Sequence, residues 1–110
     1  MSKYHSIKMT VDGVEFDSKK ECERYIKLCD MMNAGLIDQL ECQVRFELIP
    51  KMRDADGKCV RPCTYLADFV YRDNETGATI VEDVKGYKTP EYRIKKKLML
   101  QVHGITVREV

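Results

Sequence analysis

Residues 64–85 read TYLADFVYRDNETGATIVEDVK, and they predict the central pair of strands of the fold. Residues 64–72 and 79–85 are rich in aromatic and β-branched side chains, so each segment predicts a strand. The segment 73–77 between them (DNETG) contains turn-forming residues, which favours an antiparallel pair of neighbouring strands. One carboxylate, Asp68, stands among apolar neighbours in the middle of the first strand. A buried charge there costs free energy unless a metal ion, an N–H donor or a salt bridge compensates it.

The segments on either side complete an α/β pattern. From Glu41 the apolar residues alternate with polar ones until Pro50, which predicts a half-buried strand. Residues 53–58 (RDADGK) then form a turn with an Asp-Gly hairpin signal. Thr89 and Pro90 provide an N-cap and a first helical residue for a helix that Gly104 ends. Residues 105–110 follow as an edge-like strand.

The N-terminal part of the chain predicts a small hairpin and a helix. Residues 8–11 and 14–16 flank the turn Asp12-Gly13, and Ser18 is placed to cap the helix that follows. That helix should end at residues 33–35 (NAG) and dock on the sheet through one apolar stripe. The stripe comprises Cys22, Tyr25, Ile26, Cys29, Met32 and Leu36. We therefore expect one domain over residues 1–110, an α/β fold with a mixed sheet flanked by helices in the order α-β-β-β-α-β.

The composition indicates the cellular compartment of the protein more than its function. The chain has 110 residues and a net charge of +1, with neither a signal peptide nor an apolar run long enough for a membrane span. Five scattered cysteines favour reduced thiols in the cytoplasm. The spacing of Cys59 and Cys63 permits a zinc site, but no second paired motif appears.

The candidate catalytic residues are concentrated at the C-terminal end of the predicted strand 79–85. Asp83 and Lys85 share one face of a strand, and Asp68 on the neighbouring strand should lie near them. Hard Mg²⁺ prefers carboxylate oxygens, and a lysine can position or deprotonate a water that attacks a phosphate. Glu82 lies on the other face and should meet solvent or a basic partner, although which of the two acids binds metal stays open. A structural salt bridge is the competing interpretation of Asp68.

Two further features allow both a functional and a structural interpretation. Glu21 stands three residues after Ser18, the spacing of a capping box, yet its helical phase also points it along the apolar stripe toward the sheet. Glu21 is therefore either a helix cap or a third ligand of the metal or its water. Residues 85–97 carry six Lys or Arg, which suits phosphate binding or a solvated helix face. In that helix Ile94, Leu98 and Val102 are expected to face inward and Lys95, Lys96 and Lys97 outward.

The segments FDSKKE (16–21), YLADFVY (65–71) and VEDVKGY (81–87) resemble the PD-(D/E)XK nuclease superfamily. More narrowly, the chain resembles a family of small phage and prophage proteins catalogued as a domain of unknown function. The resemblance implies a restriction-endonuclease-like core and a metal-dependent DNA endonuclease. Ala67 stands where the eponymous proline would be, and the acid before x-Lys is Asp with Glu82 just ahead of it.

The resemblance also implies roles for individual residues. Asp68 and Asp83, with the Val84 carbonyl, would bind Mg²⁺, for which Mn²⁺ can substitute. Glu21 would hold a metal-bound water as the helix-borne acid, and Lys85 would be the catalytic lysine. The basic helix would contact DNA phosphates. Its candidates are Lys88, Arg93, Lys95, Lys96 and Lys97.

The substrate is less specified. The chain leaves no room for a sequence-recognition domain, so we expect selectivity for DNA structure, such as branched DNA or a Holliday junction, and a homodimer that makes paired cuts. We expect no membrane association, no small-molecule cofactor beyond the metal, and, for a phage protein, the cytoplasm of a bacterial host. The alternatives are a non-catalytic nucleic-acid-binding protein on the same fold and a general interaction module.

Overall fold

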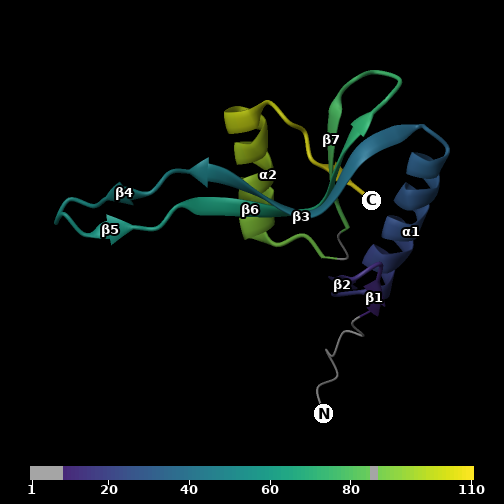
Figure 1. The fold of residues 1–110 in the computed structure, drawn as a ribbon. Coiled ribbons are helices and arrows are strands. Elements are labelled where there is room, and N and C mark those ends of the chain that lie inside the picture. The colour runs from purple at the N-terminus through teal and green to yellow at the C-terminus, as the bar shows by residue number, and fades with distance from the viewer. Residues whose placement is uncertain (1–8, 85–86) are drawn as a thin grey trace, which may run out of the picture.

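The structure is a computed structural model that describes residues 9–84 and 87–110. Its helices are α1 (Lys19–Asn33) and α2 (Pro90–His103). Its longer strands are β3 (Ile37–Ile49), β6 (Cys63–Asp73) and β7 (Thr79–Asp83). The short strands are β1 (Met9–Val11), β2 (Val14–Phe16), β4 (Met52–Arg53), β5 (Cys59–Val60) and β8 (Arg108–Glu109). Figure 1 shows their arrangement.

The central sheet has the order β3-β6-β7-β8. Strands β3, β6 and β7 form an antiparallel meander, and β8 lies parallel to β7 after the crossover through α2. The predicted mixed α/β architecture is confirmed at this level. Strand β3 starts at Ile37, whereas the sequence predicted a start at Glu41. The first residues were missed because a register shift, with Gln39 at φ 56°, interrupts the alternation of apolar and polar residues that marks the rest of the strand. The last strand pairs only over Arg108–Glu109, so it is shorter than expected.

Helix α1 begins and ends where the sequence indicates. The Ser18 hydroxyl accepts a hydrogen bond from the Glu21 N–H at 3.1 Å, and Gly35 adopts φ 78° after the last turn. The predicted apolar stripe is wrong in part. Leu28, which was not in it, is fully buried with Cys22, whereas Ile26 is 47% exposed. Met32 and Leu36 are also exposed, since they lie at and beyond the end of the helix, past the main contact with the sheet.

Helix α2 has the predicted caps but a different buried face. Thr89 accepts from the Tyr92 N–H at 3.0 Å, and Gly104 ends the helix at φ 68°. Tyr92 and Met99 are buried, one on each side of the half-buried Lys95 and Lys96, while Leu98 is partly buried as expected. Ile94 and Val102 are exposed, which contradicts the prediction. The lysine stems lie along the buried stripe and extend their ammonium groups to the surface, so Lys95 and Lys96 do not simply point outward.

Two hydrophobic clusters meet at Asp68. Phe69 and Tyr71 belong to the cluster under α1, whereas Tyr65 and Ala67 belong to the cluster that contains the buried residues of α2. A regular strand would keep these four alternate residues on one face. The change of cluster therefore marks an irregularity in β6 at Asp68, where the carboxylate replaces a ladder contact.

A two-stranded extension lies beyond the sheet. Strands β4 and β5 form a separate small sheet past the ends of β3 and β6, and Figure 1 shows it projecting away from the helices. Sequence analysis predicted the turn at its tip but not the ribbon. The hairpin β1–β2 was predicted and is confirmed from Met9 onward, while Lys8 lies outside the described residues. Within the described part of the chain, neither helix is long and apolar enough to cross a membrane.

Candidate functional site

Asp68 lies where β6 and β7 separate. The ladder between these strands ends at the pair Phe69–Glu82, and beyond it the Val84 N–H donates to Asp68 Oδ2 at 2.7 Å. A side chain thus takes the hydrogen bond that a backbone carbonyl would accept in a continuing ladder. This contact fixes the Asp68 carboxylate against the end of β7 and brings it close to Asp83.

Asp83 is held on the same side as the α2 cluster. Its side chain is 1% exposed, and its Oδ2 accepts a hydrogen bond from the Tyr65 hydroxyl. Its backbone carbonyl accepts from the Val110 N–H at 3.1 Å, and its parallel neighbour on β8 is Glu109. Asp83 therefore has a fixed position set by β6, β7 and the C-terminal segment together.

Three carboxylates influence one another here. Burial raises the pKa of Asp68 to about 7, against the lowering effect of the Val84 N–H. The negative charges of Glu21 and Asp83 raise that pKa further, as does a hydrogen bond between the Asp68 and Asp83 carboxyls. Such a bond requires a proton on one carboxyl, which is the state expected when two acids share a site without a cation. The structure therefore places Asp68 beside Asp83, as the sequence predicted, and within the influence of the charge of Glu21, whose role the sequence left open between a helix cap and a third ligand.

Glu82 serves a different contact. It is fully buried and accepts two hydrogen bonds from Arg24 of α1, at 2.8 and 2.6 Å, and a third from the Tyr71 hydroxyl. Of the two predicted environments, the basic partner is right and solvent is wrong. A fork of this kind satisfies both carboxylate oxygens. It joins α1 to β7, and Glu21 lies on α1 one turn before Arg24. Arg24 could not be predicted from the sequence, because nothing local marks which basic residue of a helix has a buried partner.

Within residues 9–84 and 87–110, no three His, Cys, Asp or Glu side chains form a group that could hold a metal ion as they stand. Asp68 and Asp83 do provide an adjacent pair of carboxylates, which is the protein contribution that Mg²⁺ commonly uses along with waters and substrate phosphates. Lys85, the predicted catalytic lysine, lies outside the described residues.

The basic residues around α2 fall into two groups. Lys88 and Lys96 pair with Glu109 at 2.9 and 3.2 Å, and these contacts together with Tyr92 lower the pKa of Glu109 to about 2. Lys95 pairs with Glu91 at 2.9 Å. Arg93 and Lys97 are exposed one turn apart and line a cavity of about 490 Å³. Other residues of that cavity are Lys88, Lys96, Leu100, Thr106 and Glu109. Because β8 neighbours β7, this basic surface lies beside the strand that carries Asp83.

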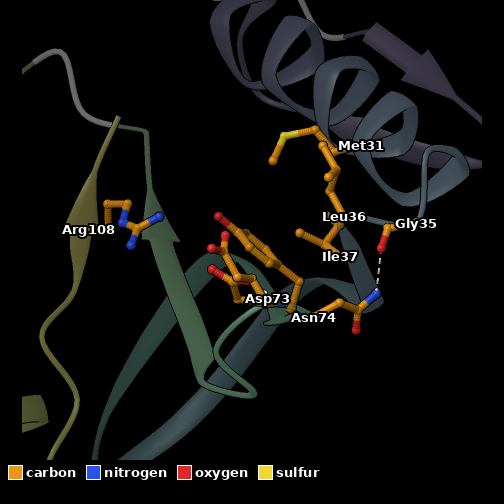
Figure 2. A pocket seen from close by; sticks show the side chains of 9 residues that line it. Met31, Gly35, Leu36, Ile37, Asp73, Asn74 and Arg108 are labelled. Carbon is orange, nitrogen blue, oxygen red and sulfur yellow. Dashed lines mark hydrogen bonds between the residues drawn. The ribbon is translucent and has the colours of Figure 1, made fainter.

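A second cavity lies elsewhere. It encloses about 540 Å³ between the end of α1, the start of β3 and the end of β6. Figure 2 shows Met31, Leu36 and Ile37 on its apolar side, with Asn74 donating to the Gly35 carbonyl at 2.9 Å. None of the three clustered carboxylates lines it. Despite its size, this cavity is therefore not part of the site formed by the carboxylates.

Comparison with known proteins places the chain in a family. The family described as "Protein of unknown function (DUF1064)" matches residues 1–108. The chain belongs to this family. No curated protein and no solved structure matches it significantly. The DUF1064 assignment agrees with the predicted resemblance to a domain of unknown function, and it assigns no activity to the three carboxylates.

Proposed function

We propose that this DUF1064 protein is a metal-dependent DNA endonuclease of the PD-(D/E)XK kind. One observation carries the proposal: the carboxylates of Asp68 and Asp83 lie together where two neighbouring strands separate, and burial with the negative charges of Glu21 and Asp83 raises the pKa of Asp68 to about 7. A cluster of acids that disfavours its own ionisation is a typical cation site. Two carboxylates on adjacent antiparallel strands, with an acid on the preceding helix, support the proposal because they resemble the arrangement expected for that superfamily.

The order of elements supports the same proposal. Helix α1 precedes the meander β3–β6–β7, and α2 then leads to β8 parallel to β7. This order resembles a restriction-endonuclease-like core with the β4–β5 ribbon inserted between its first two strands. Since one fold supports many functions, the topology raises the expectation of nuclease activity, and the carboxylates carry the argument.

The residues of the chain would act as follows. Asp68, Asp83 and the Val84 carbonyl would hold Mg²⁺ or Mn²⁺, which when bound lowers the pKa of water and neutralises charge on the scissile phosphate. Glu21 would hold a water that is bound to the metal. Tyr65 would keep the Asp83 carboxylate oriented, because its hydroxyl donates a hydrogen bond to that carboxylate. Lys85 would position or deprotonate the attacking water. On the basic surface beside β8, Arg93 and Lys97 would hold flanking phosphates.

A cleavage assay tests this function. Linear duplex, single-stranded, flap and four-way-junction DNA are incubated with the protein in Mg²⁺, Mn²⁺ or EDTA. We expect metal-dependent cleavage that falls at least a hundredfold in Asp68→Asn, Asp83→Asn and Lys85→Ala. Asp30→Asn is the matched control, because Asp30 is an exposed acid on the last turn of α1. The best substrate then decides whether structure selectivity, as in junction resolution, is correct.

Each other outcome has a defined meaning. DNA binding without cleavage on any substrate favours the alternative, a non-catalytic nucleic-acid-binding protein on the same fold. Cleavage retained in Asp68→Asn and Asp83→Asn removes the assignment of the site. Sedimentation with and without junction DNA tests the homodimer that paired cuts require.

A further inference from the structure

The ribbon formed by β4 and β5 is set apart from the body of the protein. The main ladder ends at the pair Ile49–Cys63, and a second ladder begins at Met52–Val60. The same register, continued through the interruption, places Pro50 opposite Pro62. Proline donates no backbone N–H, so this pair breaks the ladder on both strands at one level. We define residues 51–61 as the arm.

The arm adds nothing to either hydrophobic cluster. All residues from 49 to 62 are exposed. An isolated two-stranded ribbon is only marginally stable in water, and its ordering costs conformational entropy. Its tip is nevertheless fixed locally, because Asp54 accepts hydrogen bonds from the N–H groups of Asp56 and Lys58, each at 2.9 Å. Arg53 donates to the Gly57 carbonyl at 2.8 Å across the same turn.

Charge on the arm is positive and concentrated at its base. The segment 50–62 contains four Lys or Arg and two Asp, a net charge of +2, which leaves the rest of the chain at −1. Both acids lie in the turn at the tip. At the base, the continued register sets Lys51 directly opposite Arg61, and like charges in opposed positions are destabilising. The alternation of a strand adds Arg53 to this face and leaves Met52 and Val60 on the other.

The position of the arm relates it to the carboxylate site. Strand β6 carries Asp68 and runs directly into the arm. Arg61 precedes Asp68 by seven residues, which corresponds to about 23 Å of extended strand, and the level of Arg53 lies at about 30 Å. At 3.4 Å per base pair, these distances cover about seven to nine base pairs of duplex. A two-stranded ribbon also has a width that the major groove of DNA admits.

We infer that the arm is a second DNA-binding surface, on which Lys51, Arg61 and Arg53 contact backbone phosphates about seven to nine base pairs from the cleaved bond. A phosphate between Lys51 and Arg61 would remove the repulsion across the strands. This inference rests on the proposed function and deepens it, since it extends the bound duplex away from the carboxylates. Recognition of phosphates alone implies that the arm contributes affinity and no base preference.

The test compares variants for binding to a fluorescein-labelled 30-base-pair duplex in EDTA, by anisotropy over a range of KCl concentrations. Lys51→Ala/Arg61→Ala should bind about tenfold more weakly at 100 mM KCl, and its log K against log salt should be shallower by about 2, for two lost phosphate contacts. Its cleavage rate at saturating DNA with Mg²⁺ should equal that of the wild type. Lys27→Ala/Arg72→Ala removes the same charge from exposed positions on α1 and the far end of β6 and should bind more tightly than the arm variant.

Several outcomes separate this inference from the proposed function. Failure of the wild type to bind any DNA overturns both. Normal wild-type binding and cleavage, with the arm variant unchanged in affinity and salt dependence, overturns the arm alone. Met52→Thr/Val60→Thr changes the apolar face of the same ribbon. If it lowers the sedimenting mass while Lys51→Ala/Arg61→Ala binds DNA normally, the arm joins two copies of the chain instead. A preference of the arm for the equivalent RNA duplex would also overturn the inference.

Discussion

Asp68→Asn should stabilise the metal-free protein at pH 8. In the folded chain the pKa of Asp68 is about 7, whereas an exposed Asp has a pKa of about 3.9. The folded state thus holds this proton more tightly than the unfolded state. For an acid with a raised pKa, ionisation lowers stability as pH increases from about 4 to 7, and the loss is complete above 7. A difference of about 3 between the two pKa values corresponds to about 4 kcal/mol.

Asparagine removes the charge and keeps an oxygen that can accept from the Val84 N–H. That hydrogen bond becomes weaker, so we expect a net gain of about 2–3 kcal/mol in the free energy of unfolding at pH 8. Urea denaturation in EDTA at pH 5, 6, 7 and 8 measures it directly. The wild type should lose stability across this series and Asp68→Asn should lose much less. Asp56→Asn is the control, because it makes the same chemical change at an exposed position.

Addition of Mg²⁺ completes the measurement. A cation that binds only the folded state stabilises it, by about 2.7 kcal/mol at a hundred times its Kd. The wild type should therefore regain stability at pH 8 with Mg²⁺, and Asp68→Asn should not respond. A wild type whose stability is flat from pH 5 to 8, or an Asp68→Asn variant that is less stable than the wild type at pH 8, would show that the carboxylates do not repel one another as described.

Two further variants test the contacts that frame the site. Glu82→Gln should lower the free energy of unfolding by about 3 kcal/mol in urea denaturation, because it leaves the Arg24 guanidinium without its charged partner. A loss below about 1 kcal/mol would mean that the pair is not structural. Tyr65→Phe removes the hydroxyl that holds Asp83 and should cost about 1 kcal/mol of stability. Its cleavage rate should fall about tenfold at saturating DNA with unchanged DNA affinity, and an unchanged rate would exclude an orienting role.

Much of the fold was predictable because its signals are local. The caps at Ser18, Thr89 and Gly104 each depend on residues within one helical turn, and all three are confirmed. The alternation along β3 reflects the burial of one face. The convergence of Asp68 and Asp83 followed from the short turn between β6 and β7, which allows only an antiparallel pairing with these residues near its open end.

The features that the sequence did not predict depend on partners that are distant along the chain. Glu82 and Arg24 are 58 positions apart, and only the packing of α1 on β7 decides that they meet. Helix α2 buries the stems of Lys95 and Lys96 because their ammonium groups reach Glu91 and Glu109 at the surface. A periodicity that treats every lysine as outward-facing therefore misplaces Ile94 and Val102, which are exposed. The arm was missed for a related reason, since Pro50 ends the main ladder and gives no indication that pairing resumes beyond it.

The adjacent acids Glu82 and Asp83 contact different partners, and a single strand allows both contacts. Successive residues of β7 face opposite sides, so one carboxylate meets Arg24 under α1 while the other meets Tyr65 and Asp68. The first contact joins α1 to β7 through two hydrogen bonds from Arg24. Glu21 lies one turn earlier on that helix, and its negative charge acts on Asp68. Under the proposed function, this ion pair would supply the rigidity that a metal site needs, because repelling carboxylates would otherwise move apart in the absence of a cation.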